Sequence, residues 1–251
     1  MNRKIEITIL TGILFVLFLI CPVLGNDRVG TTMGNFLEIG YGSAGASMGD
    51  AYVSVARDIS SVFWNPAGLG FMEGNEFQVS YQPWIADINT SFLGFGHNDP
   101  LLGTFAVSLI YMDYGQEEVT NIMMPEGTGE EYGGKDLSFT MSYGRRLAEW
   151  FSFGASGKYI NSSIWHESAS ALAFDLGAIV NTNFLSPTGD RKDGFNIGVC
   201  ISNYGTKMQF DGIDLKRPVD IAPDENGNYG YTGARFETGE FHERKVLERV
   251  R

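Results

Sequence analysis

Apolar and polar residues alternate along much of the chain between residues 77 and 202. The clearest case is residues 136–143, where every second side chain is large and apolar: Leu137, Phe139, Met141 and Tyr143. Related patterns cover residues 77–84, 90–97, 103–113, 151–159, 172–180 and 194–202. A period of two is typical of a β-strand whose two faces meet different surroundings. The sequence therefore predicts an all-β protein with an antiparallel sheet.

The polar positions of these strands favour a membrane barrel over a soluble β-sandwich. They are mostly Ser, Thr, Gly and Ala and carry few charges, whereas the wet face of a soluble sheet usually carries Lys, Glu and Arg. Aromatic residues also gather near strand ends, among them Tyr81, Trp84, Tyr143, Trp150 and Trp165. Aromatic girdles at both membrane interfaces are typical of transmembrane barrels. Aromatic core residues of a sandwich remain the alternative.

The connections predict which ends of the strands lie outside. The long acidic loop at residues 114–135 is expected outside, and the turns at 98–102 and 146–150 inside. Strands number seven in this prediction, however, and a single-chain bacterial barrel has an even number. An open edge in lipid leaves backbone groups unsatisfied at several kcal/mol each. We therefore expect an incomplete barrel, either because the chain is truncated at its carboxyl end or because several chains share one barrel.

Both ends of the chain differ from the predicted strands. Residues 1–25 have the layout of an export signal, with Arg3 and Lys4 before an apolar run and small residues at its exit. An uncleaved membrane helix or a lipid-modified Cys21 is the alternative. Residues 205–251 are polar, and their last twelve residues are expected to be helical or disordered. The predicted organisation is a signal peptide at 1–25, a plug-like segment at 26–75, barrel strands at 76–204, and a polar loop and tail at 205–251.

Composition excludes some classes of function. A formal charge of −12 argues against nucleic-acid binding, since phosphates attract Lys and Arg. His97, His166 and His242 are scattered and lack the spacing of a metal site. No nucleophile, base and orienting group can be assembled, so neither catalysis nor a cofactor is expected. The run from Gly40 to Gly45 spells a dinucleotide fingerprint, but the strand and helix that this chemistry needs around it are not predicted.

Residues 26–75 are rich in small residues, which allow the backbone to pack tightly in a confined place. Asp58, Ser60 or Ser61 is expected to cap a short helix that Pro66 interrupts. A compact segment of this kind suits a plug inside a barrel, and a surface loop without a special role is the alternative.

Several motifs in this segment occur in the order found in a known family. They are Gly34-Asn35-Phe36-Leu37-Glu38-Ile39-Gly40, Gly42-Ser43-Ala44-Gly45, Met48-Gly49-Asp50-Ala51 and Asn65-Pro66-Ala67-Gly68-Leu69. Together they resemble the start of the PorV/PorQ proteins, which belong with the FadL-like outer-membrane barrels. The resemblance covers about residues 30–112, returns at 202–205 and 208–212, and is absent from the last dozen residues. It implies that Asn65, Pro66, Ala67 and Gly68 are structural plug residues.

The resemblance implies an outer-membrane accessory of protein secretion, of the type IX kind, that binds secreted cargo or secretion components. FadL-like transport of hydrophobic small molecules is the second hypothesis, and a structural surface protein is the third. Expected partners are outer-membrane lipid, cargo or secretion components, and hydrophobic ligands in the transport case. No nucleic acid is expected as a partner.

Overall fold

The computed structural model describes residues 33–219, 235–238, 244–245 and 249–250. The predicted signal peptide at residues 1–25 lies outside the described residues, as does much of the predicted tail.

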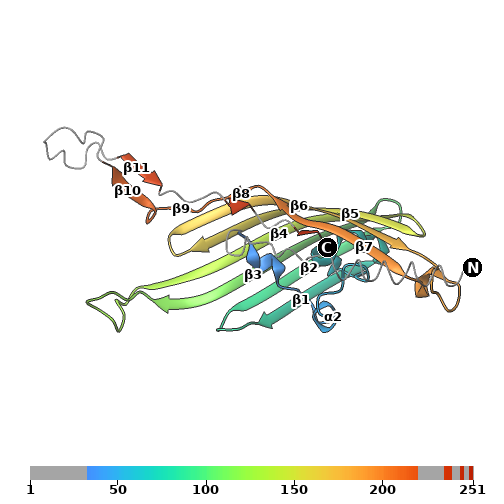
Figure 1. The fold of residues 1–251 in the computed structure, drawn as a ribbon, viewed down its shortest axis with the longest axis horizontal. Coiled ribbons are helices and arrows are strands. Elements are labelled where there is room, and N and C mark those ends of the chain that lie inside the picture. The colour runs from blue at the N-terminus through green and yellow to red at the C-terminus, as the bar shows by residue number, and fades with distance from the viewer. Residues whose placement is uncertain (1–32, 220–234, 239–243, 246–248, 251) are drawn as a thin grey trace, which may run out of the picture. The chain divides into compact units, whose positions relative to one another are not determined.

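The main sheet is an antiparallel meander in which each long strand pairs with the next along the chain (Figure 1). Its strands are β1 (Asn75–Pro83), β2 (Asn89–Asp99), β3 (Gly103–Glu118), β4 (Glu131–Ala148), β5 (Phe151–Ile164), β6 (Glu167–Asn181) and β7 (Asn196–Gly205). The predicted antiparallel sheet is confirmed. Among the described residues, β1 does not pair with β7, so the sheet is open rather than closed into a barrel.

The remaining strands are short. β8 (Lys207–Met208) pairs with β12 (Arg244–Lys245), β9 (Asp211–Gly212) pairs with β6, and β13 (Arg249–Val250) pairs with β7. β10 (Lys216–Val219) and β11 (Arg235–Thr238) form a separate pair. Within the segment that was expected to be helical or disordered, the described residues of β12 and β13 are therefore extended and paired with earlier strands.

One predicted loop is shorter than expected. Residues 114–135 were expected to form one loop, but β3 continues to Glu118 and β4 begins at Glu131, because the strands resume pairing beyond a bulge near Gly115. Residues 203–205, which lie beyond the predicted strand at 194–202, are also extended and form the end of β7. Hydrogen bonding between the backbones of β3 and β4 extends these two strands past the residues where their side chains alternate.

The amino-terminal segment consists of short helical turns. They are η1 (Asn35–Glu38), α2 (Ser43–Ser47), α3 (Ser61–Trp64) and η2 (Pro66–Phe71). As expected, a short helix precedes Pro66. The side chain of Ser60 does not cap α3, but Oδ1 of Asp58 accepts from the backbone N–H of Ser60 at 3.0 Å, just before the helix begins. Among the described residues, no helix has the length and hydrophobicity needed to cross a membrane.

The amino-terminal segment covers one face of the sheet, which we call the covered face; the opposite one is the open face. In β5 the covered face presents Ser152, Gly154, Ser156, Lys158 and Ile160, all of them buried. The alternate residues Phe153 and Tyr159 are exposed on the open face. The covered face therefore buries small and polar side chains together with some large apolar ones such as Phe92 and Ile160, whereas the open face exposes large apolar side chains.

Candidate functional site

Asn65 fastens the amino-terminal segment to the sheet. Its side chain is fully buried and uses both of its polar atoms. The amide nitrogen donates to the carbonyl oxygens of Val53 at 3.0 Å and of Ala178 in β6 at 3.4 Å, while Oδ1 accepts from the backbone N–H of Ala67 at 3.0 Å. The last bond caps η2, whose first residue is Pro66, the position where a missing N–H has least effect. One side chain thus starts the helical turn and ties it to β6.

A row of glycines on the covered face receives this turn. Gly144, Gly154 and Gly177 lie side by side on β4, β5 and β6 because the strand register aligns them. A Cβ atom on Gly154 would lie 2.2 Å from the carbonyl carbon of Pro66, and one on Gly177 would lie 1.9 Å from Oδ1 of Asn65. Real Cβ atoms do not approach other atoms so closely. Only glycine on these strands allows the backbone of residues 65–67 to rest on the sheet.

We call the place where residues 65–67 rest on Gly144, Gly154 and Gly177 the seat. Neighbouring contacts extend the seat across the sheet. The hydroxyl group of Ser152 in β5 lies 2.6 Å from the carbonyl oxygen of Ala67 and donates to it. Farther along, Gly198 in β7 faces the backbone of Ser54, and Gly96 in β2 faces Met72. Residues 53–72 therefore run across the strands from β7 to β2.

An aromatic cluster holds the earlier part of the segment. The buried indole of Trp64 donates to the carbonyl oxygen of Tyr41 at 3.1 Å, and its ring lies where side chains on Gly40 and Gly45 would otherwise be. The hydroxyl groups of Tyr41 and Thr90 in β2 are 2.8 Å apart, and burial raises the pKa of Tyr41 to about 12. Tyr41 therefore stays protonated and neutral. The small residues that spell a dinucleotide fingerprint make room for an indole ring.

A buried ion pair lies on the covered face beside the seat. Nζ of Lys158 in β5 is 2.7 Å from Oδ2 of Asp175 in β6, and the two side chains are 4% and 1% exposed. Asn203 in β7 links them: its Oδ1 accepts from Lys158 and its backbone N–H donates to Asp175, both at 2.7 Å. Asn203 has a left-handed backbone with φ of 58°, at an irregularity in the pairing of β6 with β7. The bulge directs the N–H at the carboxylate.

A polar cavity of about 600 Å³ opens where the segment leaves the sheet. The guanidinium groups of Arg57 and Arg146 lie over the ring of Phe71, at 5.0 and 5.9 Å from its centre. Arg191 also lines the cavity and pairs with Glu149 at 3.1 Å. In the part of the chain that the structure describes, no group of His, Cys, Asp and Glu is placed to hold a metal ion.

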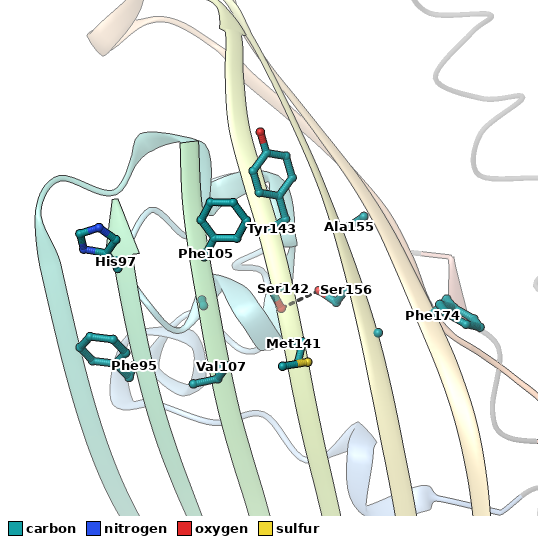
Figure 2. A pocket seen from close by; sticks show the side chains of 12 residues that line it. Phe95, His97, Phe105, Val107, Met141, Ser142, Tyr143, Ala155, Ser156 and Phe174 are labelled. Atoms are coloured by element: carbon teal, nitrogen blue, oxygen red, sulfur yellow. Dashed lines mark hydrogen bonds between the residues drawn. The ribbon is translucent and has the colours of Figure 1, made fainter. Parts of the chain in front are cut away.

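The open face carries an apolar groove, also of about 600 Å³. Figure 2 shows the large side chains of its walls, which project from β2, β3, β4 and β6: Phe95, Phe105, Val107, Met141, Tyr143 and Phe174. Ala155 and Gly157 in β5 line the groove between them. Behind it, Ser142 and Ser156 are hydrogen-bonded at 2.8 Å (Figure 2). Apolar groups make up most of the lining of the groove, and His97 in β2 adds an imidazole ring to it (Figure 2).

Residues 24–221 match a family model described as type IX secretion system protein PorV. The chain belongs to the PorV family. The match includes every part of the sequence on which the resemblance was based, so the predicted PorV membership is confirmed. Among curated proteins, no significant match to the chain is found. Membership of the PorV family connects the chain with type IX secretion.

The structure brings the four predicted motif residues together: Asn65, Pro66, Ala67 and Gly68 all lie buried at the seat. Sequence reasoning missed their counterparts on the sheet, which are the glycine row and the pair of Lys158 and Asp175. A signal for the pair was present, since each is a charged residue whose neighbours on the same face are small or apolar: Ser156 and Ile160 for Lys158, Ala173 and Gly177 for Asp175. Their partnership depends on register between strands, which the sequence alone does not supply.

Proposed function

We propose that the chain is an outer-membrane protein of the PorV type that assists type IX secretion by binding cargo at the membrane. The family match supports the part in secretion. The observation that carries the membrane proposal is the exposed apolar face of the sheet. We further propose that the sheet forms part of a FadL-type barrel wall whose open face contacts lipid.

The open face is too apolar for a surface in water. Met141 and Phe174 are 60% and 56% exposed, and they belong to a continuous set that includes Phe95, Phe105, Phe139 and Leu176. Burial of one such side chain contributes about 1.5–3 kcal/mol, and soluble monomers rarely expose apolar patches above a few hundred Å². Lipid tails would remove this cost. The lengths of the strands fit as well, since β2 has 11 residues and β5 has 14, whereas about 9–11 cross a bilayer.

Exposed apolar residues near the strand ends also fit a sheet that spans a bilayer. At one end of the sheet, the connections carry the exposed residues Leu101, Leu102, Trp150, Phe184 and Leu185, and the end of β4 carries exposed Leu147. At the opposite end, Trp84 and Trp165 are exposed beside their strands. Aromatic and aliphatic side chains at both strand ends match the two interfaces of a bilayer.

In this proposal residues 26–75 are the plug and residues 76–204 are barrel strands. Asn65, Pro66, Ala67 and Gly68 hold the plug on the wall, and the buried polar face becomes the lining of the lumen. The edge of β1, and the part of β7 that β13 does not pair, would pair with strands outside the described sheet, because an unpaired edge in lipid leaves backbone groups unsatisfied.

Deletion of the gene in the native cells tests the secretion proposal. We expect proteins of the type IX route to be retained inside the cell, and expression of the wild-type chain to restore their release. The variant Glu149→Gln, which changes only an exposed ion pair, should restore release equally and serves as a matched control. Unchanged release after deletion would contradict a part in secretion.

Affinity purification from detergent-solubilised outer membranes tests cargo binding. The tagged chain should recover secreted proteins or secretion components, and an unrelated tagged barrel should not. Recovery of bound lipid alone would replace cargo binding by transport of hydrophobic small molecules.

A further inference from the structure

The hairpin of β3 and β4 extends past its neighbours in the sheet (Figure 1). Pairing of β3 with β2 ends at Asp113, and pairing of β4 with β5 begins at Gly134. Residues 114–133 therefore form a separate arm, whose two strands are bonded mainly to each other. The ladder continues beyond the strands through bonds of Val119 with Glu130 at 2.7 Å and with Thr128 at 2.8 Å.

The tip of this arm carries the most exposed large apolar side chains among the described residues. Ile122 is 101% exposed and Met123 is 91% exposed, and Met124 beside them is 51% exposed. Single apolar residues at a surface are ordinary. Consecutive ones at a loop tip are unfavourable, because their apolar surface contacts water and packs against nothing. Met side chains adapt to irregular surfaces and are frequent at protein-binding sites.

The tip has a fixed backbone. Oδ1 of Asn121 accepts from the backbone N–H groups of Met123 at 2.9 Å and Met124 at 2.8 Å. The main chains of Asn121 and Met124 also bond to each other, at 3.1 and 3.3 Å. Because the turn is closed in this way, docking of its side chains would cost little backbone entropy.

The arm below the tip is acidic. Its exposed carboxylates are Glu117, Glu118, Glu126, Glu130 and Glu131, and the nearest cationic side chain along the sequence is Lys135, beyond the arm. Segments that lie on membranes usually carry Lys and Arg beside their apolar residues. Insertion of this tip into lipid would bring Glu126, two residues from Met124, to an interface that disfavours its charge. A protein surface with positive charge around an apolar recess would satisfy both parts of the arm.

We propose that residues 122–124 dock into an apolar recess of a partner protein and that Lys and Arg around this recess face the carboxylates of the arm. This interaction surface goes beyond the proposed function, and it holds whichever face of the sheet contacts lipid. The apolar tip supplies most of the affinity, and the carboxylates set orientation and the rate of association.

Site-specific photo-crosslinking in the native cells tests the proposal. A photoreactive amino acid replaces Met123, and the attached peptide is identified by mass spectrometry. We expect one protein surface whose crosslinked peptide is apolar and lies beside Lys or Arg. The double change Ile122→Ser with Met124→Ser should lower the yield roughly tenfold or more. The matched change Ile85→Ser removes another exposed apolar residue, 74% exposed, and should leave the yield unchanged.

Charge variants provide the second measurement. Glu117→Gln, Glu118→Gln and Glu130→Gln together should lower the yield about two- to fivefold, and added salt should diminish the difference. All these side chains are exposed, so the outer-membrane level of each variant should match that of the wild type. Crosslinks to lipid, to a protein surface without Lys or Arg, or no crosslink at all would overturn the proposal. An unchanged yield in the Ser variant would also overturn it.

Discussion

The two faces of the sheet share the same strands but have opposite surroundings. On β4 and β5 the covered face presents Ser142 and Ser156, which are buried and hydrogen-bonded to each other. At alternate positions of the same strands, Met141 and Tyr159 are exposed on the open face. A soluble sheet buries its apolar face and wets its polar one. Here the relation is reversed, so alternation alone reports that two faces differ but not which of them meets protein.

The covered face should tolerate change poorly because it is fixed by close contacts and paired charges. On the proposal that the open face contacts lipid, this face should tolerate any apolar side chain, because fluid lipid tails would adapt to it. Substitutions matched between the faces test this contrast, with the free energy of unfolding in lipid vesicles as the measurement.

The largest effect is expected at the buried ion pair. Asp175→Asn leaves Lys158 charged, buried and without its carboxylate partner, and should lower the free energy of unfolding by about 3–5 kcal/mol. The control Glu149→Gln, at the exposed pair with Arg191, should change it by less than about 0.5 kcal/mol. Equal effects at the two pairs would contradict the distinction between buried and exposed charges.

The glycine row should respond next. Gly154→Ala places a methyl group against the backbone of Pro66 and should cost about 2–3 kcal/mol, the upper part of the usual range of about 1–3 kcal/mol for overpacking. Gly157→Ala on the same strand faces the open side, where the nearest atom to the new Cβ is 4.0 Å away in Phe174. It should leave the free energy of unfolding unchanged or raise it by up to about 1 kcal/mol, because Gly inside a strand is less favourable than Ala. If Gly154→Ala proves as mild as its control, the seat is not a close contact.

Asn65→Ala removes the cap of η2 and the bonds to Val53 and Ala178 together. Loss of a cap and of buried hydrogen bonds predicts a decrease of about 2 kcal/mol. Protease digestion of the variant should also cut within residues 53–72 earlier than in the wild type. Wild-type cleavage rates would indicate that other contacts hold the segment.

The smallest effect is expected on the open face. Phe174→Leu should change the free energy of unfolding by less than about 0.5 kcal/mol, since lipid tails fill the released space and are as apolar as Leu. Phe92→Leu at a fully buried position of the covered face should cost about 1–2 kcal/mol, because the cavity remains. A larger loss at Phe174 would place protein against the open face.

The sequence predicts the strands well where alternation is strong, as in residues 136–143, because period two leaves one interpretation. It does not predict the arm, because the sequence around Glu117, Glu118, Glu130 and Glu131 lacks alternating apolar residues. Backbone pairing alone extends β3 and β4 through this region. Nor does it predict that Gly144, Gly154 and Gly177 meet, because residues on three strands become neighbours only once their register is known. The motif Asn65–Gly68 could be found from its order among other motifs, and its part as a plug stays a prediction.

Spin labels placed one at a time at residues 137–143 of β4 in lipid vesicles test the central claim most directly. Collisions with dissolved oxygen report exposure to lipid, and collisions with a water-soluble nickel chelate report exposure to water. The account predicts high oxygen accessibility at Leu137, Phe139, Met141 and Tyr143, and low accessibility to both reagents at Ser138, Thr140 and Ser142. High nickel accessibility at Phe139 and Met141, with oxygen accessibility that does not alternate, would contradict it.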